Sequence, residues 1–250
     1  FLPFTTVFAW FATKLVPARP APPGPIKPAY LDASVLDVPS LALDRVRKEL
    51  ARASEIILTM FQTAGKALRS DDIDMMRSLV REDDKIDFLE TACLDYLSKI
   101  RQHHLTSAES LDHQHLMVSA VALENLGDVI ETDIVRLGVQ AIQISHERSE
   151  ETKRLTYDLY ASVENCLLLL GSVLSEKNQT AAEKILQYER KVKSIQQELM
   201  VRKSNRLGSE DEAALKTARI EVSFSDKLVR MYSIVKRITK ENIEPDQQES

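Results

Sequence analysis

The distribution of proline and glycine is the feature that most constrains how this chain can fold. Eight of its nine prolines fall at or before Pro39, and the ninth is Pro245. Between Ser40 and Glu244 there is no proline, and there are only five glycines. Proline disrupts helix interiors and both residues mark turns, so a sheet of many short strands would need more of them. The sequence therefore predicts an all-α protein built from long helices.

The apolar residues after Pro39 follow helical periodicity. The first expected helix begins near Asp37, as its N-cap, with Pro39 in its first turn. The other expected helices cover 71–101, 106–145, 147–175, 179–204 and 209–241. Along the first helix, apolar spacings of three and four alternate without a miss, at Leu43, Val46, Leu50, Ala53, Ile57, Met60, Ala64 and Ala67.

Two of these helices begin with the same capping signal. Thr106 with Glu109, and Ser209 with Glu212, each combine a hydroxyl with a glutamate three residues later, which is the spacing of a capping box. They open the third and sixth helices, which indicates a duplicated three-helix unit. We therefore expect six long helices in two tandem three-helix bundles, over 39–146 and 147–242, and a disordered tail at 243–250.

The N-terminal stretch differs in composition from the helical region. Residues 1–16 are mostly apolar with no charge before Lys14, and a proline-rich linker at 17–38 contains Arg19 and Lys27. Sixteen residues are too few to span a bilayer, which takes about 20. Because the chain begins with Phe rather than Met, we interpret 1–16 as the end of a longer transmembrane segment, with the following basic residues on the cytoplasmic side. The alternative is a disordered or crystal-packed hydrophobic tail.

Charge and cysteine content exclude several classes of function. A net charge of -5 lacks the excess of Lys and Arg that nucleic acid requires of a partner, so no nucleic-acid binding is expected. Cys93 and Cys166 lie in apolar helical patterns without CxxC spacing, which indicates reduced core thiols. The sequence contains no Glu-x-x-His pair, no phosphate-binding glycine loop and no catalytic-triad motif, so we do not expect an enzyme.

Acidic residues interrupt apolar lines on the second and third expected helices. On each helix they recur at i, i+4 and i+7, which places them on one face. If the two helices form an antiparallel pair that turns near His104, the two triplets lie level to within about 4.5 Å, at 1.5 Å per residue. The triplets are Asp83, Asp87 and Glu90 on the second helix and Glu124, Asp128 and Glu131 on the third.

Six carboxylates that face one another repel and are costly to desolvate, so they need either solvent or a cation. Oxygen ligands suit hard ions such as Mg²⁺, Ca²⁺, Mn²⁺ or iron. The pattern therefore predicts a metal site formed by these six acids. The alternative is a solvated face whose acids pair with Lys85 or with arginines.

Short segments of the chain resemble a known family. Asp-Asp-Lys-Ile-Asp at 83–87 and Glu-Asn-Leu-Gly-Asp at 124–128 resemble the two acidic E(D)xxxD signatures of the PhoU family, whose fold is a pair of three-helix bundles. The segments LPFTTVFAWFATKLVP and PAYLDASVLDVPSLALDRVRKEL, on either side of the proline-rich run, are similar to a junction in bacterial sodium-dependent phosphate cotransporters. There the membrane domain passes into a C-terminal PhoU-like domain. The resemblance covers nearly the whole chain.

The resemblance implies a function as well as a fold. PhoU proteins bind multinuclear metal clusters at such signatures and regulate phosphate uptake without catalysing a reaction. Ligand roles carry over to Asp83, Asp87, Glu124 and Asp128, whereas Glu90 and Glu131 are added from the helical spacing. The implied cofactor is one or more divalent or trivalent ions of iron, Mn, Mg or Zn. The implied partner is the membrane domain of the same transporter, which handles inorganic phosphate, on the cytoplasmic side of the bacterial inner membrane.

The second repeat departs from the symmetric family pattern. Where the second helix has its acids, the fifth has Glu189, Lys193 and Gln196; where the third has them, the sixth has Glu221, Ser225 and Leu228. A lysine in such a site would repel a cation. We therefore predict one metal site, in the first bundle.

Two other functions and an oligomeric state stay open. One is a free-standing helical adaptor or phosphate-signalling regulator without bound metal, and the other is a di-metal hydrolase or oxidase. A homodimer is also open. Residues 166–174, CLLLLGSVL, are apolar on all sides of the expected fourth helix, so this helix is either central in the second bundle or part of an interface.

Overall fold

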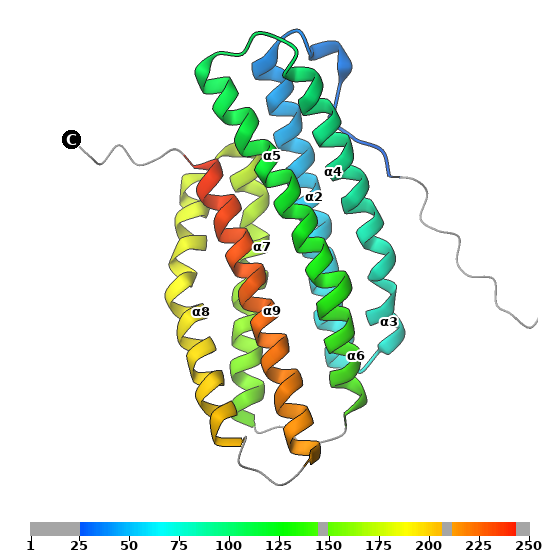
Figure 1. Cartoon of the computed structure of the whole chain (residues 1–250), viewed down its shortest axis with the longest axis vertical. Coiled ribbons are helices and arrows are strands. Elements are labelled where there is room, and N and C mark those ends of the chain that lie inside the picture. The colour runs from blue at the N-terminus through cyan, green and yellow to red at the C-terminus, as the bar shows by residue number, and fades with distance from the viewer. Residues whose placement is uncertain (1–25, 145–149, 207–211, 244–250) are drawn as a thin grey trace, which may run out of the picture.

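The computed structural model describes residues 26–144, 150–206 and 212–243, and these residues form helices and connecting segments without a β-strand. The first half contains the short 3₁₀ helix η1, the α-helices α2 to α6 and the π-helix η2. The second half contains the three long helices α7, α8 and α9 (Figure 1). The elements are η1 (Ala33–Val35), α2 (Pro39–Ser70), α3 (Ile73–Ser78), α4 (Val80–Ile100), α5 (Ser107–Asp128), the π-helix η2 (Val129–Ile134), α6 (Val135–Gln143), α7 (Glu150–Glu176), α8 (Gln179–Arg206) and α9 (Glu212–Asn242).

Helix α2 buries the apolar line that the sequence predicts for it. Each residue of that line, from Leu43 to Ala67, is at most 3% exposed. Pro39 is at the start of the helix as expected, but the N-cap is Val38, which makes no side-chain capping bond. The side chain of the expected cap, Asp37, is 92% exposed. The prediction of Asp37 as a cap is therefore wrong. The fixed backbone φ angle of Pro39 favours the start of the helix instead.

Two of the expected helices are interrupted. The helix predicted over 71–101 divides at Leu79, whose backbone N–H bonds to Met76 in a tight turn. Asp72 caps α3 by accepting a bond from the Met75 N–H at 2.8 Å. The helix predicted over 106–145 begins with the expected capping box of Thr106 and Glu109, but it passes through η2 before α6. The other capping box falls on Ser209, outside the described residues.

The six helical segments are arranged as two three-helix sets around one core. The first set contains α2, α3 with α4, and α5 with η2 and α6; the second contains α7, α8 and α9 (Figure 1). The most extensive packing between the sets joins α2 to α7, and α5 also packs on α9. The predicted fold class, all-α with two three-helix bundles, is confirmed. Cys166 and Leu170 of α7 are fully buried, so α7 takes the central place that was one of its two alternatives.

The described end of the linker is fastened to the first set through a buried carboxylate. Glu49 of α2 is fully buried, and its Oε2 accepts bonds from the N–H groups of Ala29 and Tyr30 at 2.7 and 2.8 Å. Arg52 donates to Glu49 Oε1 at 2.6 Å and to the Lys27 carbonyl at 3.0 Å. These bonds hold residues 27–30 against α2.

The apolar segment at 1–16, residues 17–25 of the linker and the tail after 243 lie outside the described residues. Among the helices that are described, none combines the length and the low charge that crossing a lipid bilayer requires.

We predict that Glu49→Ala lowers the free energy of unfolding by about 2–4 kcal/mol, because it leaves two buried N–H groups and Arg52 without their acceptor. Urea unfolding monitored by circular dichroism measures the change. The control is Glu55→Ala, at an exposed position of the same helix, which should cost less than about 1 kcal/mol. Equal losses in the two variants would contradict the anchoring role of Glu49.

Candidate metal centre

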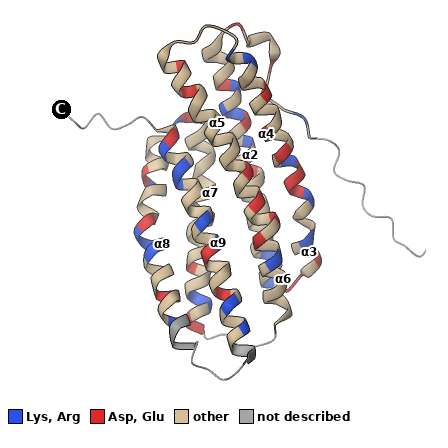
Figure 2. Cartoon of the chain, viewed as in Figure 1, with Lys and Arg blue, Asp and Glu red and all other residues tan. Residues whose placement is uncertain are grey.

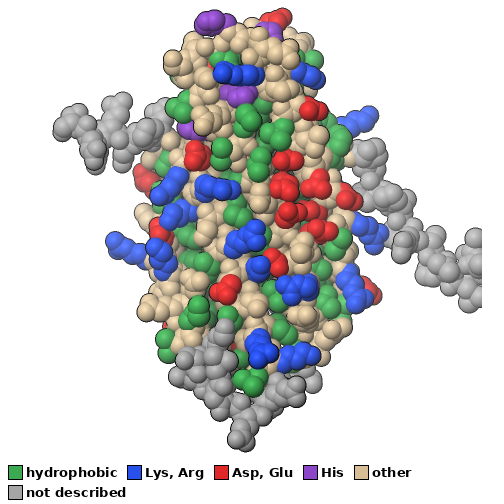
Figure 3. Space-filling model, in the orientation of Figure 1, with side chains coloured by type: hydrophobic (Ala, Val, Ile, Leu, Met, Phe, Trp, Pro, Cys, Tyr) green, Lys and Arg blue, Asp and Glu red, His purple; other side chains and the backbone are tan. Residues whose placement is uncertain are grey.

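The six predicted acids lie on an antiparallel helix pair, with α4 carrying three and α5 with η2 carrying the others. The acids lie in the first half of α4 and around the junction of α5 with η2. Red segments mark acidic residues on the ribbon in Figure 2, and Figure 3 shows acidic side chains gathered on this face of the molecule. Asp83 is buried at 5% exposure, Glu90, Glu124 and Glu131 are half-buried, and Asp87 and Asp128 are exposed. Asp83 is therefore the buried end of the site, and the other five acids are partly or largely open to solvent.

Three of the six acids converge closely. One carboxylate oxygen each from Asp83, Asp128 and Glu131 lie within 4.8 Å of one another. Within the described ranges this is the one group of three or more His, Cys, Asp or Glu residues that approach so closely. Asp87, Glu90 and Glu124 are not part of this triad.

Asp83 provides the strongest sign that the triad needs a further partner. Its Oδ1 is buried and has no hydrogen-bond partner among the described residues. Buried polar atoms are almost always hydrogen-bonded, and an isolated buried carboxylate is costly. A hard cation is the kind of partner that three carboxylate oxygens can hold, so the donor set fits a metal ion.

Gly127 makes the position of Asp83 possible. A Cβ atom at residue 127 would lie only 2.3 Å from Asp83 Oδ1, so any other residue would displace this carboxylate. The absence of a side chain at Gly127 lets Asp83 approach the backbone of α5. Gly127 is not among the site residues predicted from the sequence, although it directly precedes Asp128.

The π-helix lies directly at the triad. It begins at Val129, immediately after Asp128, and Glu131 is in its first turn. A π-helical segment adds a residue to a helical turn and is frequent at functional sites. The sequence predicts an unbroken α-helix here, so the structure corrects the spacing that was assumed between Asp128 and Glu131.

Burial and mutual repulsion raise the pKa values of four acids. For Asp83 the pKa rises to about 7, first because of burial and then because of the charges of Asp87, Glu131, Asp128 and Glu124. Burial and the charges of Asp128 and Glu90 raise the pKa of Glu124 to about 7 as well. The pKa values of Asp87 and Glu90 also lie above their ordinary values, with the partial loss of solvent around each carboxylate as the largest cause.

No cationic side chain compensates this charge within the described part of the chain. Lys85, which was the expected partner in the solvated alternative, pairs with Glu82 instead. The six acids form no ion pair with any other described residue. The cluster is therefore an uncompensated negative site.

The corresponding region of the second set is chemically different. Glu189 pairs with Lys193 at 2.7 Å and with Lys236 at 2.8 Å, and hydrogen bonds from both lysines lower its pKa to about 2. Ser225 donates to the Val222 carbonyl, and Leu228 is fully buried. The charge of this region is neutralised by the protein itself.

Residues 50–137 match the family model of the PhoU domain. A PhoU domain is therefore present in this chain. The match contains the first set from α2 into α6 and includes all six acids.

Solved PhoU structures have the same fold as this chain. PhoU from Pseudomonas aeruginosa superposes with a TM-score of 0.72 at 16% identity, over 80% of this chain and 94% of that one. The phosphate transport system regulatory protein PhoU from Streptococcus pneumoniae gives a TM-score of 0.69 at 16% identity, over 81% and 94%. The likeness extends the PhoU fold beyond the matched domain into the second set.

Curated relatives are similar over almost the whole chain. The "Putative inorganic phosphate export protein YjbB" of Salmonella typhimurium is 23% identical over 99% of this chain, and the YjbB proteins of Escherichia coli are 21% identical over the same share. The chain spans 46% of the length of these relatives.

We predict that the metal-free protein loses stability as the pH rises from 5 to 8. Asp83 has a folded pKa of about 7 against an ordinary value of 3.8, so between these values the folded state binds the extra proton. The unfolding free energy therefore falls with rising pH, by the order of 2 kcal/mol when screening by water and counterions is included.

Urea unfolding in EDTA at several pH values tests this dependence. The pair Asp83→Asn and Glu124→Gln should flatten the profile, whereas Asp95→Asn with Glu55→Gln, at exposed positions outside the cluster, should leave it unchanged. A parent protein whose stability increases from pH 5 to pH 8 would show that the cluster is not desolvated.

Proposed function

We propose that this chain is a metal-binding regulatory domain of a bacterial phosphate transporter. It would lie on the cytoplasmic side of the inner membrane and control phosphate movement through the membrane domain of the same protein. The observation that carries the proposal is the buried, unpartnered Asp83 carboxylate within the acidic cluster of a PhoU domain.

The arrangement of the acids suggests how they would share the ligand roles. Asp83, Asp128 and Glu131 are close enough to bind one ion together. Asp87, Glu90 and Glu124 raise the pKa values of their neighbours, so they lie near enough to extend the site. A second or third ion beside the first would use these carboxylates, as in a multinuclear cluster.

The donor set favours hard ions but does not select one of them. Carboxylate oxygens suit Mg²⁺, Mn²⁺ and iron, and zinc also accepts them. When bound, the ion would supply the positive charge that the described side chains lack at this site. Carboxylates with pKa values near 7 exchange protons for metal at neutral pH, so occupancy should increase as the pH rises.

The relatives support a role in phosphate transport. The YjbB proteins are named for inorganic phosphate export, and the sequence resembles the junction of sodium-dependent phosphate cotransporters. Both point to phosphate crossing a membrane, in opposite directions. We propose that the phosphate passes through the membrane domain, while this chain responds to metal and acts through the linker held by Glu49.

We predict that the purified chain binds Mn²⁺, Mg²⁺, Zn²⁺ or iron stoichiometrically and that Asp83→Asn with Asp128→Asn abolishes this binding. Each substitution removes one charge and one oxygen ligand while keeping the size of the side chain. Elemental analysis of protein after exhaustive dialysis measures the metal content. The matched control is Asp95→Asn with Asp226→Asn, two exposed acids outside the cluster, which should retain the metal of the parent.

A second variant separates geometry from charge. Gly127→Ala keeps all six carboxylates but places a methyl group against Asp83 Oδ1, so it should reduce metal content at unchanged net charge. Gly171→Ala is its control, because a Cβ there meets only Ser54 at 3.5 Å, an ordinary contact. If neither the parent nor any variant carries metal, and chelation leaves stability unchanged, the metal-binding proposal fails.

We further predict that Asp83→Asn with Asp128→Asn changes phosphate flux through the full-length transporter. Radiolabelled phosphate movement across membrane vesicles measures the flux, at equal amounts of transporter in the membrane. Asp95→Asn with Asp226→Asn should behave as the parent does. Metal binding without any change in flux would leave a metal site but remove its proposed role in transport.

A further inference from the structure

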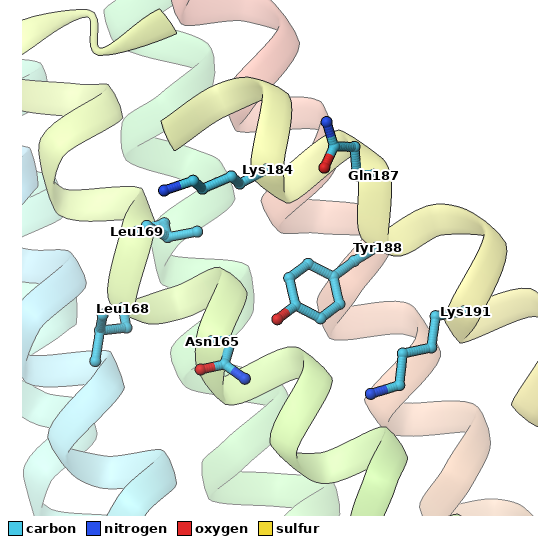
Figure 4. A pocket seen from close by; sticks show the side chains of 7 residues that line it. All are labelled: Asn165, Leu168, Leu169, Lys184, Gln187, Tyr188 and Lys191. Carbon is cyan, nitrogen blue, oxygen red and sulfur yellow. The ribbon is translucent and has the colours of Figure 1, made fainter. Parts of the chain in front are cut away.

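A pocket lies between α7 and α8, in the set that lacks the acidic cluster. Its volume is about 410 Å³. Helix α7 supplies Asn165, Leu168 and Leu169, and α8 supplies Lys184, Gln187, Tyr188 and Lys191. Figure 4 shows that Lys184, Tyr188 and Lys191 project from α8 toward α7, with the Tyr188 hydroxyl directed toward Asn165.

The pocket is positively charged in a chain of net charge -5. Its lining includes two lysines and no acid. Neither lysine forms an ion pair with a described residue, whereas Lys193 on the same helix pairs with Glu189. Both ammonium groups are therefore available to an anion.

The lysines stand at opposite ends of an apolar and aromatic centre. Lys184 and Lys191 are seven residues apart, which places their backbones about 10.5 Å apart along α8. The Tyr188 ring lies between them on the same helical face, and Leu169 projects from α7 toward it (Figure 4). Leu168 is 59% exposed at the rim of the groove.

The remaining polar side chains add hydrogen-bonding capacity. Asn165 and Gln187 each offer a donor and an acceptor, and Tyr188 offers a hydroxyl. These side chains form no hydrogen bond with other described residues, so their polar atoms are free to meet a ligand. Asn and Gln amides can form paired hydrogen bonds with the edge of an adenine base.

We propose that this pocket binds a nucleotide, with its base beside Tyr188 and Leu169 and its phosphates on the lysines. A volume of about 410 Å³ falls in the usual range of small-molecule sites, roughly 300–1,000 Å³. Inorganic phosphate would leave the aromatic and apolar centre unused. The proposal goes beyond metal-dependent regulation and depends on residues of α7 and α8 alone.

Isothermal titration of the whole chain with ATP, in EDTA, tests the proposal. EDTA removes any ion that could recruit phosphate to the acidic cluster, so failure here is separate from failure of the metal site. ATP should bind at one site per chain, and adenosine or inorganic phosphate should bind at least about tenfold more weakly.

Matched variants locate the site. Lys184→Gln with Lys191→Gln should weaken ATP binding at least about tenfold, and Tyr188→Ala should weaken it as well. Lys193→Gln with Lys240→Gln removes the same charge from exposed positions outside the pocket and should stay within about twofold of the parent. The proposal is overturned if ATP does not bind, if inorganic phosphate binds as tightly, or if both double variants lose affinity equally.

Discussion

The packing of α2 against α7 is the most extensive contact between two helices, and it joins the two three-helix sets. Phe61 and Tyr160 stack with ring centroids 4.0 Å apart, and the Tyr160 hydroxyl donates to the Phe61 carbonyl. Gly65 permits this contact, because a Cβ there would lie 3.0 Å from the tyrosine ring. With these faces joined, α2 offers its remaining apolar surface to α4 and α5, and α7 offers its own to α8 and α9. The acidic cluster therefore lies on α4 and on α5 with η2, the cationic pocket lies on α7 and α8, and the contact between α2 and α7 joins the two sets.

The two sets differ in whether lysine side chains neutralise a buried or half-buried carboxylate. Glu189 is neutralised by Lys193 and Lys236, so its charged form is stabilised. Asp83 is more deeply buried and faces other acids, so its charged form is destabilised. Because folded proteins are only marginally stable, such an uncompensated group persists where something outside the polypeptide offsets its cost. This difference supports a ligand-binding role for the first set, although the two sets share a fold.

Much of the fold could be predicted because it depends on local signals. The apolar line of α2 and the capping box of Thr106 and Glu109 are both visible in the sequence and present in the structure. The break at Leu79 and the π-helix after Asp128 carry no such signal, because packing between helices decides them. The helical spacing predicted which acids share a face. It could not predict that Asp83 is buried, since that depends on how closely α4 approaches Gly127 of the neighbouring helix.

Helix α4 connects the acidic cluster to the linker. Its first half carries Asp83 and Glu90, and in its second half the Tyr96 hydroxyl donates to the Asp32 carbonyl at 2.5 Å. Cys93 lies between these two positions on α4. Burial and the nearby charges of Glu49 and Glu90 raise the pKa of its thiol to about 12. Glu49, which holds the linker, and Glu90 of the cluster therefore both influence this thiol. A cation that drew the acids together would move α4 relative to α5. Because α4 carries these acids and also contacts the linker through Tyr96, such a movement would displace that linker contact.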